Sequence, residues 1–278
     1  MENSFVKNKL EQIKREGYGL HLEGVLSDAF DIHKKSILPG FLATFLYLVV
    51  MMVAGLSMFS TLYGMSLTEF VEMIQKNPNA LEATMGSISW TSIFIYSVVA
   101  GVAGGLVAPL LSGIYKVAYH TQYGVNGSIS DLFAYYKQPY FLNIFIYTFV
   151  LSFVLQVLNF GLDQSIPVLG ALIAFVIQIF LSVTFVLTIP FIIFANFSWI
   201  EALKASMAVT FKNWFFLFFI LLISVIISFI GVIFCGIGVL FTFPFLYIAT
   251  FVLYDKIIGF NNEGFNNEKD DIAKIGEI

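Results

Sequence analysis

Few side chains in this sequence have the type and spacing that catalysis or metal binding requires. The three histidines, His21, His33 and His120, have no His, Cys, Asp or Glu three or four positions away. A zinc or iron site needs three or four such ligands to converge, and Cys235 is the only cysteine. The sequence therefore predicts no metal site and no cofactor.

Acidic residues near two of these histidines permit one enzymatic hypothesis. His33, Asp31, His120 or Asp131 could act on membrane lipids at the cytoplasmic rim. However, Asp28 and Asp131 occupy the same position in two similar segments, where a helix start or a pairing with lysine explains them without chemistry. The G-x-S-x-G motif of serine hydrolases is absent as well. We therefore favour a protein without enzymatic activity.

Uncharged polar side chains within apolar stretches are the remaining candidates for a binding role: Gln156, Asn159, Gln178, Thr188 and Thr242. Proton relays and cation sites in membranes generally use ionisable residues, so coupled transport and ion conduction are not expected. Neutral polar groups more often join helices by hydrogen bonds. The alternative is a continuous cavity, lined by these residues, for an uncharged or lipidic substrate.

Three prolines lie inside apolar stretches: Pro109, Pro190 and Pro244. The last two stand in nearly identical sequences, Thr-Ile-Pro-Phe and Thr-Phe-Pro-Phe. Proline removes a backbone donor and clashes with the carbonyl four residues earlier, so each proline predicts a kink. Thr188 and Thr242 are candidate partners for the freed carbonyls. The kinks could frame a cavity or hinge, although bends that serve packing are the simpler interpretation.

Four glycines give one apolar stretch a smooth side: Gly101, Gly104, Gly105 and Gly113. Small residues at such spacing let another helix approach closely in a membrane. We favour packing between parts of the same chain over a homodimer face.

Six apolar stretches set the fold class. A bilayer core about 30 Å thick needs roughly 20 apolar residues per helix, and only 12% of the chain is charged, against about 25% in soluble domains. The sequence predicts an all-α, polytopic membrane protein, with membrane lipids as partners and no nucleic acid. The stretches are residues 37–58, 91–115, 139–162, 167–195, 213–233 and 237–254.

The basic residues predict the orientation of the chain. Of the 14 Lys and Arg residues, only Lys76 falls in a segment on the opposite side of the predicted spans from the others. Cytoplasmic loops are enriched in Lys and Arg, so both termini should be cytoplasmic. Amphipathic segments at 22–34 and 198–212 should lie on the cytoplasmic surface, and Ser198 with Glu201 has capping-box spacing.

A unit that recurs three times predicts the organisation of the chain. Each copy has a short amphipathic segment that ends near a lysine, then a span, then a second span with proline. The first two copies share Ser-Asp-x-Phe before the lysine. The resulting divisions are an N-terminal amphipathic segment (1–36), three hairpins (37–118, 119–197 and 198–260) and a flexible cytoplasmic tail (261–278), all within one membrane domain (1–278).

Residues 198–258 carry a likeness to a known group, in Ser198–Phe215, Gly236–Gly238, Thr242–Phe245 and Tyr254–Asp255. This part of the chain resembles the closing third of uncharacterised bacterial six-helix inner-membrane proteins. Those proteins are similar to the membrane domain that accompanies some glycerophosphodiester phosphodiesterases. The resemblance implies a six-helix fold in the bacterial cytoplasmic membrane. It does not imply phosphodiesterase activity.

These observations favour a scaffold that interacts with lipids or with other membrane proteins. A transporter or flippase for an uncharged or lipidic substrate is the alternative. The sequence gives no oligomeric state.

Overall fold

The computed structural model describes residues 2–77, 89–166, 168–233 and 236–260, and every regular element in this part of the chain is helical. The tail at 261–278 lies outside the described residues. Six helical segments are long and apolar enough to cross a membrane: Ile37–Leu56, Trp90–Gln122, Tyr140–Ser165, Leu169–Ala195, Trp214–Ile233 and Val239–Ile257. The predicted all-α class with six apolar spans is therefore confirmed.

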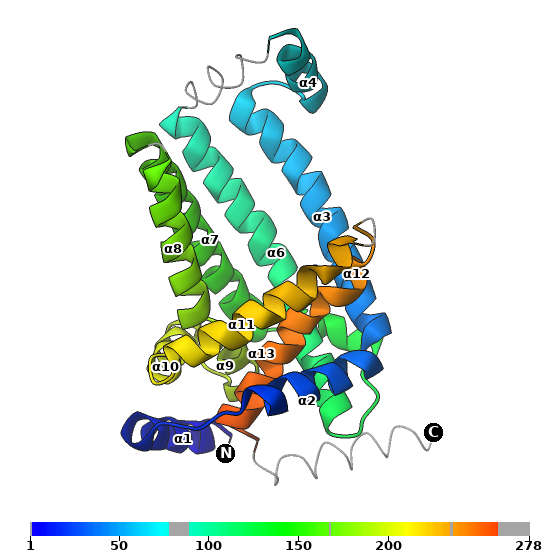
Figure 1. Ribbon diagram of the computed structural model, residues 1–278, viewed down its shortest axis with the longest axis vertical. Helices are drawn as coiled ribbons and strands as arrows, with labels where there is room; N and C mark the ends of the chain where they lie inside the picture. The colour runs from blue at the N-terminus through cyan, green and yellow to red at the C-terminus, as the bar shows by residue number, and fades with distance from the viewer. Residues whose placement is uncertain (1, 78–88, 167, 234–235, 261–278) are drawn as a thin grey trace.

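Two helices at the start of the chain mark one end of the bundle (Figure 1). These are α1 (Glu2–Glu16) and α2 (Leu22–Lys35), and we call this the α1 end. The first pair of spans is α3 (Ile37–Tyr63) and α6 (Trp90–Gln122). Between them, α4 (Leu67–Lys76) lies at the opposite end, which we call the α4 end.

The second and third pairs of spans differ from the first because their second members are broken. The second pair is α7 (Tyr140–Ser165) followed by α8 (Leu169–Thr184) and α9 (Thr188–Ala195). The third is α11 (Trp214–Phe229), which continues into the short helix η2 (Ile230–Ile233), followed by α12 (Val239–Thr242) and α13 (Pro244–Ile257).

The three prolines therefore act differently. Pro190 lies in the first turn of α9 and Pro244 is the first residue of α13, so each stands just after a helix break, where its missing N–H matters least. Pro109 lies inside α6, which continues through it. At that level Tyr136 donates a hydrogen bond of 3.0 Å to the carbonyl of Leu106.

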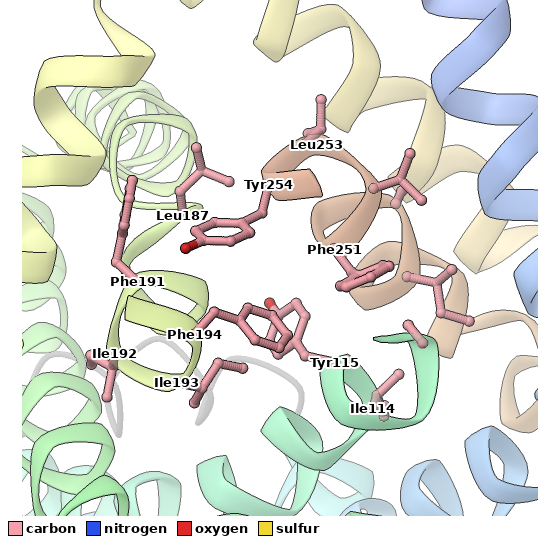
Figure 2. Packing of buried hydrophobic residues seen from close by; sticks show 14 of the residues in the cluster. Ile114, Tyr115, Leu187, Phe191, Ile192, Ile193, Phe194, Phe251, Leu253 and Tyr254 are labelled. Carbon is pink, nitrogen blue, oxygen red and sulfur yellow. The ribbon is translucent and has the colours of Figure 1, made fainter. Parts of the chain in front are cut away.

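The core lies at the α1 end, where α6, α9 and α13 meet. Phe194 and Tyr254 lie with ring centroids 5.3 Å apart, and Phe194 and Phe251 lie 5.9 Å apart. Figure 2 shows these side chains and Tyr115 of α6 pointing into one cluster. Burying large aromatic side chains together stabilises such a cluster, also through edge-to-face ring contacts.

A short helix precedes each pair of spans and covers the core at the α1 end. These helices are α2, η1 (Ile129–Tyr136) and α10 (Trp199–Thr210). α2 packs mainly on α13, η1 on α6, and α10 on α9. Each therefore packs on the second span of a different pair from the one that it precedes. The sequence predicts a short amphipathic segment before Lys137, and in the structure this segment is a 3₁₀-helix.

One predicted local feature agrees with the structure. Ser198 and Glu201 form a capping box at the start of α10, in which the Ser198 N–H donates to a Glu201 carboxylate oxygen at 3.0 Å. Asn196 directly follows α9, adopts a left-handed backbone conformation with φ of 53° and closes that helix.

Candidate functional site

A polar-lined cavity of about 480 Å³ lies among the spans, between α3, α6, α7 and α13. Four tyrosines from these four helices line it: Tyr47, Tyr96, Tyr147 and Tyr247. Tyr147 is buried and the other three are half-buried. The cavity is partly open to the exterior. Two of the helices that line it, α3 and α6, diverge toward the α4 end (Figure 1).

One face of α7 supplies the other polar groups of the cavity. Thr148, Ser152 and Gln156 line it, and they follow one another at intervals of four residues. Residues four apart on an α-helix stand one above the other, so these three side chains form a polar stripe. Of the three, the sequence analysis singles out Gln156 alone, although the four-residue spacing of the stripe is visible in the sequence.

Small residues of α6 make the wall next to this stripe. Ala100, Gly104 and Ala108 line the cavity, again at intervals of four. A Cβ added at Gly104 would lie 3.7 Å from Ser152 Oγ, an ordinary contact distance. The cavity exists because this face of α6 has almost no side-chain volume.

The other three glycines of α6 are covered by neighbouring parts of the chain. A Cβ at Gly101 would lie 2.9 Å from the ring of Phe149, and one at Gly105 would lie 2.8 Å from the ring of Phe145. A Cβ at Gly113 would overlap the backbone of Leu132 in η1. Gly101 and Gly105 thus pack against α7, and Gly113 packs against η1.

Two of the predicted polar residues lie elsewhere. Asn159 and Gln178 line a separate groove between α7 and α8, together with Asp163. Gln156 is the only predicted candidate that lines the cavity described above. The structure therefore does not bring the predicted polar residues together along one path.

The threonines beside the broken spans also lie outside the cavity. Thr242 Oγ1 donates to the carbonyl of Ser228 at 2.6 Å and so ties the break before α13 to α11. Thr188 is fully buried in α9, and its Oγ1 has no hydrogen-bond partner among the described residues. Neither hydroxyl supports a substrate path.

The break between α8 and α9 is held by polar groups from other helices. Ser206 of α10 donates to the carbonyl of Thr184 at 2.8 Å and accepts from the N–H of Leu187 at 3.2 Å. Thr210 donates to the same carbonyl at 3.1 Å, and Tyr147 donates to that of Phe185 at 3.4 Å. Backbone groups freed by a helix break need such partners away from water.

A buried ionic cluster joins η1 to α6. The sequence singles out His120 and Asp131 separately but does not predict that they pair. His120 and Asp131 are 8% and 7% exposed, and His120 Nδ1 lies 3.0 Å from an Asp131 carboxylate oxygen. Asp131 also accepts from the Ser128 N–H at 2.8 Å, and Lys116 Nζ lies 3.9 Å from its other oxygen. His120 Nε2 is buried without a hydrogen-bond partner in the described part of the chain.

These contacts fix the charge state of Asp131. Burial by itself would raise the pKa of this carboxyl. Hydrogen bonds from His120 and from the Ser128 backbone outweigh burial and hold the pKa below its usual range. An ionised carboxylate only accepts hydrogen bonds, so His120 Nδ1 donates.

The other residues of the enzymatic hypothesis are not gathered into one site. Asp31 pairs with Lys34 on the surface of α2 at 3.2 Å. His33 packs edge-on to Phe245 of α13, and burial lowers its pKa. Asp28 pairs with Lys256 of α13 at 2.6 Å, as the lysine-pairing interpretation expects. Within the described residues, no group of three His, Cys, Asp or Glu side chains could hold a metal ion.

Comparison with protein-family models, with curated proteins and with solved structures finds no match to this chain.

Proposed function

We propose that this chain is a multi-pass protein of the bacterial cytoplasmic membrane, with the α1 end in the cytoplasm. The support is the distribution of charge. Lys7, Lys9, Lys14 and Arg15 of α1 lie at the α1 end, whereas Lys76 of α4 lies at the other. Positive residues near span ends stay on the cytoplasmic side.

This orientation predicts the behaviour of reporter fusions. Green fluorescent protein fused after Ile278 is expected to fluoresce, and alkaline phosphatase at the same point to be inactive. Alkaline phosphatase inserted after Lys76 is expected to be active. The reverse pattern would contradict the proposed orientation.

The proposed architecture is three related hairpins: α3 with α6, α7 with α8 and α9, and α11 with α12 and α13. Its support is the order of packing at the α1 end. The short helix before each hairpin packs on the second span of the preceding hairpin, and α2 of the first hairpin packs on α13 of the last. A related unit repeated three times around an axis would produce this closed order. An experimental structure in which these helices pack on their own hairpins would contradict it.

The function that the geometry supports best is binding of a lipid, without catalysis. The observation that carries this proposal is the cavity, which is lined by apolar and uncharged polar groups and communicates with the exterior among the spans. Its volume of about 480 Å³ falls within the range of about 300–1,000 Å³ typical of small-molecule sites. Because the cavity opens between helices proposed to cross the membrane, lipid from the bilayer fills it.

Transport of a lipid is less well supported than binding. At the α1 end, Tyr247 of the cavity packs against Tyr115 of the aromatic core, with ring centroids 5.7 Å apart. Asn159 and Gln178 line a different groove. A substrate that crossed the membrane by way of the cavity would have to separate the core of Figure 2.

Filling the cavity tests the proposed function. The wild-type protein, purified in mild detergent, is expected to retain lipid detectable by native mass spectrometry. Gly104→Leu places a side chain in the cavity and should remove most of that lipid. Gly55→Leu is the matched control, because Gly55 of α3 has open space around it. Equal lipid retention by the two variants, or none in the wild type, would reject lipid binding in the cavity.

A further inference from the structure

The hydroxyl groups on the polar stripe of α7 differ from most buried hydroxyls on the spans, although Thr188 of α9 also lacks a partner among the described residues. Buried serines and threonines of these helices donate to the carbonyl four residues earlier: Ser97, Ser112, Ser224, Ser228 and Thr250. Thr148 and Ser152 make no such bond in the described part of the chain, and Thr148 Oγ1 is buried without a partner.

This difference points to a ligand with polar groups. A hydroxyl away from water loses free energy unless it makes a hydrogen bond, and donation to its own helix is the usual solution. Ser152 lines the cavity instead, beside Gln156 and next to Gly104, whereas Thr148 Oγ1 is shielded from the cavity. A bound molecule with acceptor and donor groups would satisfy Ser152 and Gln156.

The tyrosines of the cavity extend the same chemistry around its wall. Tyr47, Tyr96 and Tyr247 make no hydrogen bond to another described residue, while Tyr147 makes a long one at 3.4 Å. A tyrosine hydroxyl both donates and accepts. Ester carbonyls can accept from such groups, and a free hydroxyl can donate to them or to the Gln156 amide oxygen.

The cavity lining has no charged side chain among the described residues, and this favours an uncharged ligand. No Lys, Arg or His, and no Asp or Glu, is among its lining residues. Moving a phosphate group into such a site without a cationic partner would be strongly unfavourable. Apolar lining residues such as Met51, Leu111 and Leu151 suit the first methylene groups of acyl chains.

We propose that the cavity selects an uncharged glycerolipid with one free hydroxyl and ester carbonyls, the chemistry of diacylglycerol, over phospholipids. The inference rests on the proposed lipid-binding function and adds the class of lipid to it. The glycerol hydroxyl and esters meet Ser152, Gln156 and the tyrosine hydroxyls, and the chains leave the cavity between α3 and α6.

The experiment compares two lipids with the same acyl chains. The full-length protein in detergent micelles is delipidated and then titrated with dioleoylglycerol or dioleoylphosphatidylglycerol, with native mass spectrometry as the readout. We expect dioleoylglycerol to bind at least tenfold more tightly. Ser152→Ala and Gln156→Leu should each weaken its binding about fivefold, the effect of one lost hydrogen bond. Ser97→Ala, which removes a hydroxyl bonded within α6, should leave binding unchanged.

The unliganded protein gives a second readout. Because Ser152 is half-buried beside the cavity, Ser152→Ala should leave the unfolding temperature without ligand unchanged while it weakens dioleoylglycerol binding. Equal binding of both lipids, unaffected by Ser152→Ala but abolished by Gly104→Leu, would overturn the selectivity and leave lipid binding standing. Binding of neither lipid would overturn both.

Discussion

Gly113→Ala is expected to lower the free energy of unfolding by about 3 kcal/mol or more, the upper part of the range for overpacked sites. The added methyl group would overlap the backbone of Leu132 in η1. A flexible side chain could move aside at small cost, whereas a backbone segment can move only if η1 separates from α6. The measurement is the unfolding midpoint of the purified protein in detergent titrated with sodium dodecyl sulfate.

Gly104→Ala is the matched control for this prediction, because both glycines lie in the same helix. The new methyl group at Gly104 has ordinary contact distances and faces the cavity. Alanine also has a higher helix propensity than glycine by about 1 kcal/mol. Gly104→Ala should therefore be neutral or stabilising. Equal effects of the two substitutions would contradict the close packing of η1 on Gly113.

The sequence predicts the glycine-rich face of α6 but only part of its role. A pattern of small residues indicates that something approaches closely, because side-chain volume is a local property of the sequence. The pattern does not say what approaches. In the structure, Gly101 and Gly105 accommodate aromatic rings of α7, Gly113 accommodates the backbone of η1, and Gly104 borders the cavity.

The spans and the capping boxes are predictable for the same reason. Apolar length is a property of consecutive residues, and a capping box depends on two residues three positions apart. The effect of proline is less local. A helix can break where other elements supply partners for the freed carbonyls, as Ser206 and Thr210 of α10 do before Pro190. These two residues are 22 and 26 positions from Thr184, whose carbonyl they bond, so a local sequence pattern does not identify them.

The pairing of His120 with Asp131 is not predictable from residues that stand three or four positions apart. The two residues are 11 positions apart and lie on different elements, α6 and η1. The sequence analysis gives Asp28 and Asp131 equivalent roles because their local sequences agree. The structure separates them: the Asp28 side chain is 38% exposed and pairs with Lys256, whereas that of Asp131 is 9% exposed.

Asp131→Ala is accordingly expected to lower the free energy of unfolding by about 3 kcal/mol, typical of breaking a buried ion pair or hydrogen-bonded network. The substitution leaves His120 Nδ1 and the Ser128 N–H without their acceptor. Asp28→Ala should lower the free energy of unfolding by about 1 kcal/mol or less, because partly exposed ion pairs contribute little. Equal losses from the two substitutions would contradict the distinction drawn from burial.

The dependence on pH separates the charge of Asp131 from its packing. The pKa of this carboxyl is lower in the folded protein than its usual value, which is about 3.9. Its contribution to stability is therefore complete above the usual value and is lost as the pH falls through the lower folded value. Wild-type protein should lose stability between about pH 5 and pH 3, and Asp131→Ala should lose less over that interval.

A double substitution tests whether Gly113 and Asp131 stabilise the same contact between η1 and α6. Gly113 contacts Leu132, the neighbour of Asp131 in the chain, and both therefore fix η1 on α6. Contacts that form or break together are not additive. If η1 detaches as a unit, the double variant Gly113→Ala, Asp131→Ala should lose about as much stability as the more severe single variant. Full additivity would mean that the two contacts hold α6 and η1 independently, and that η1 does not move as one body.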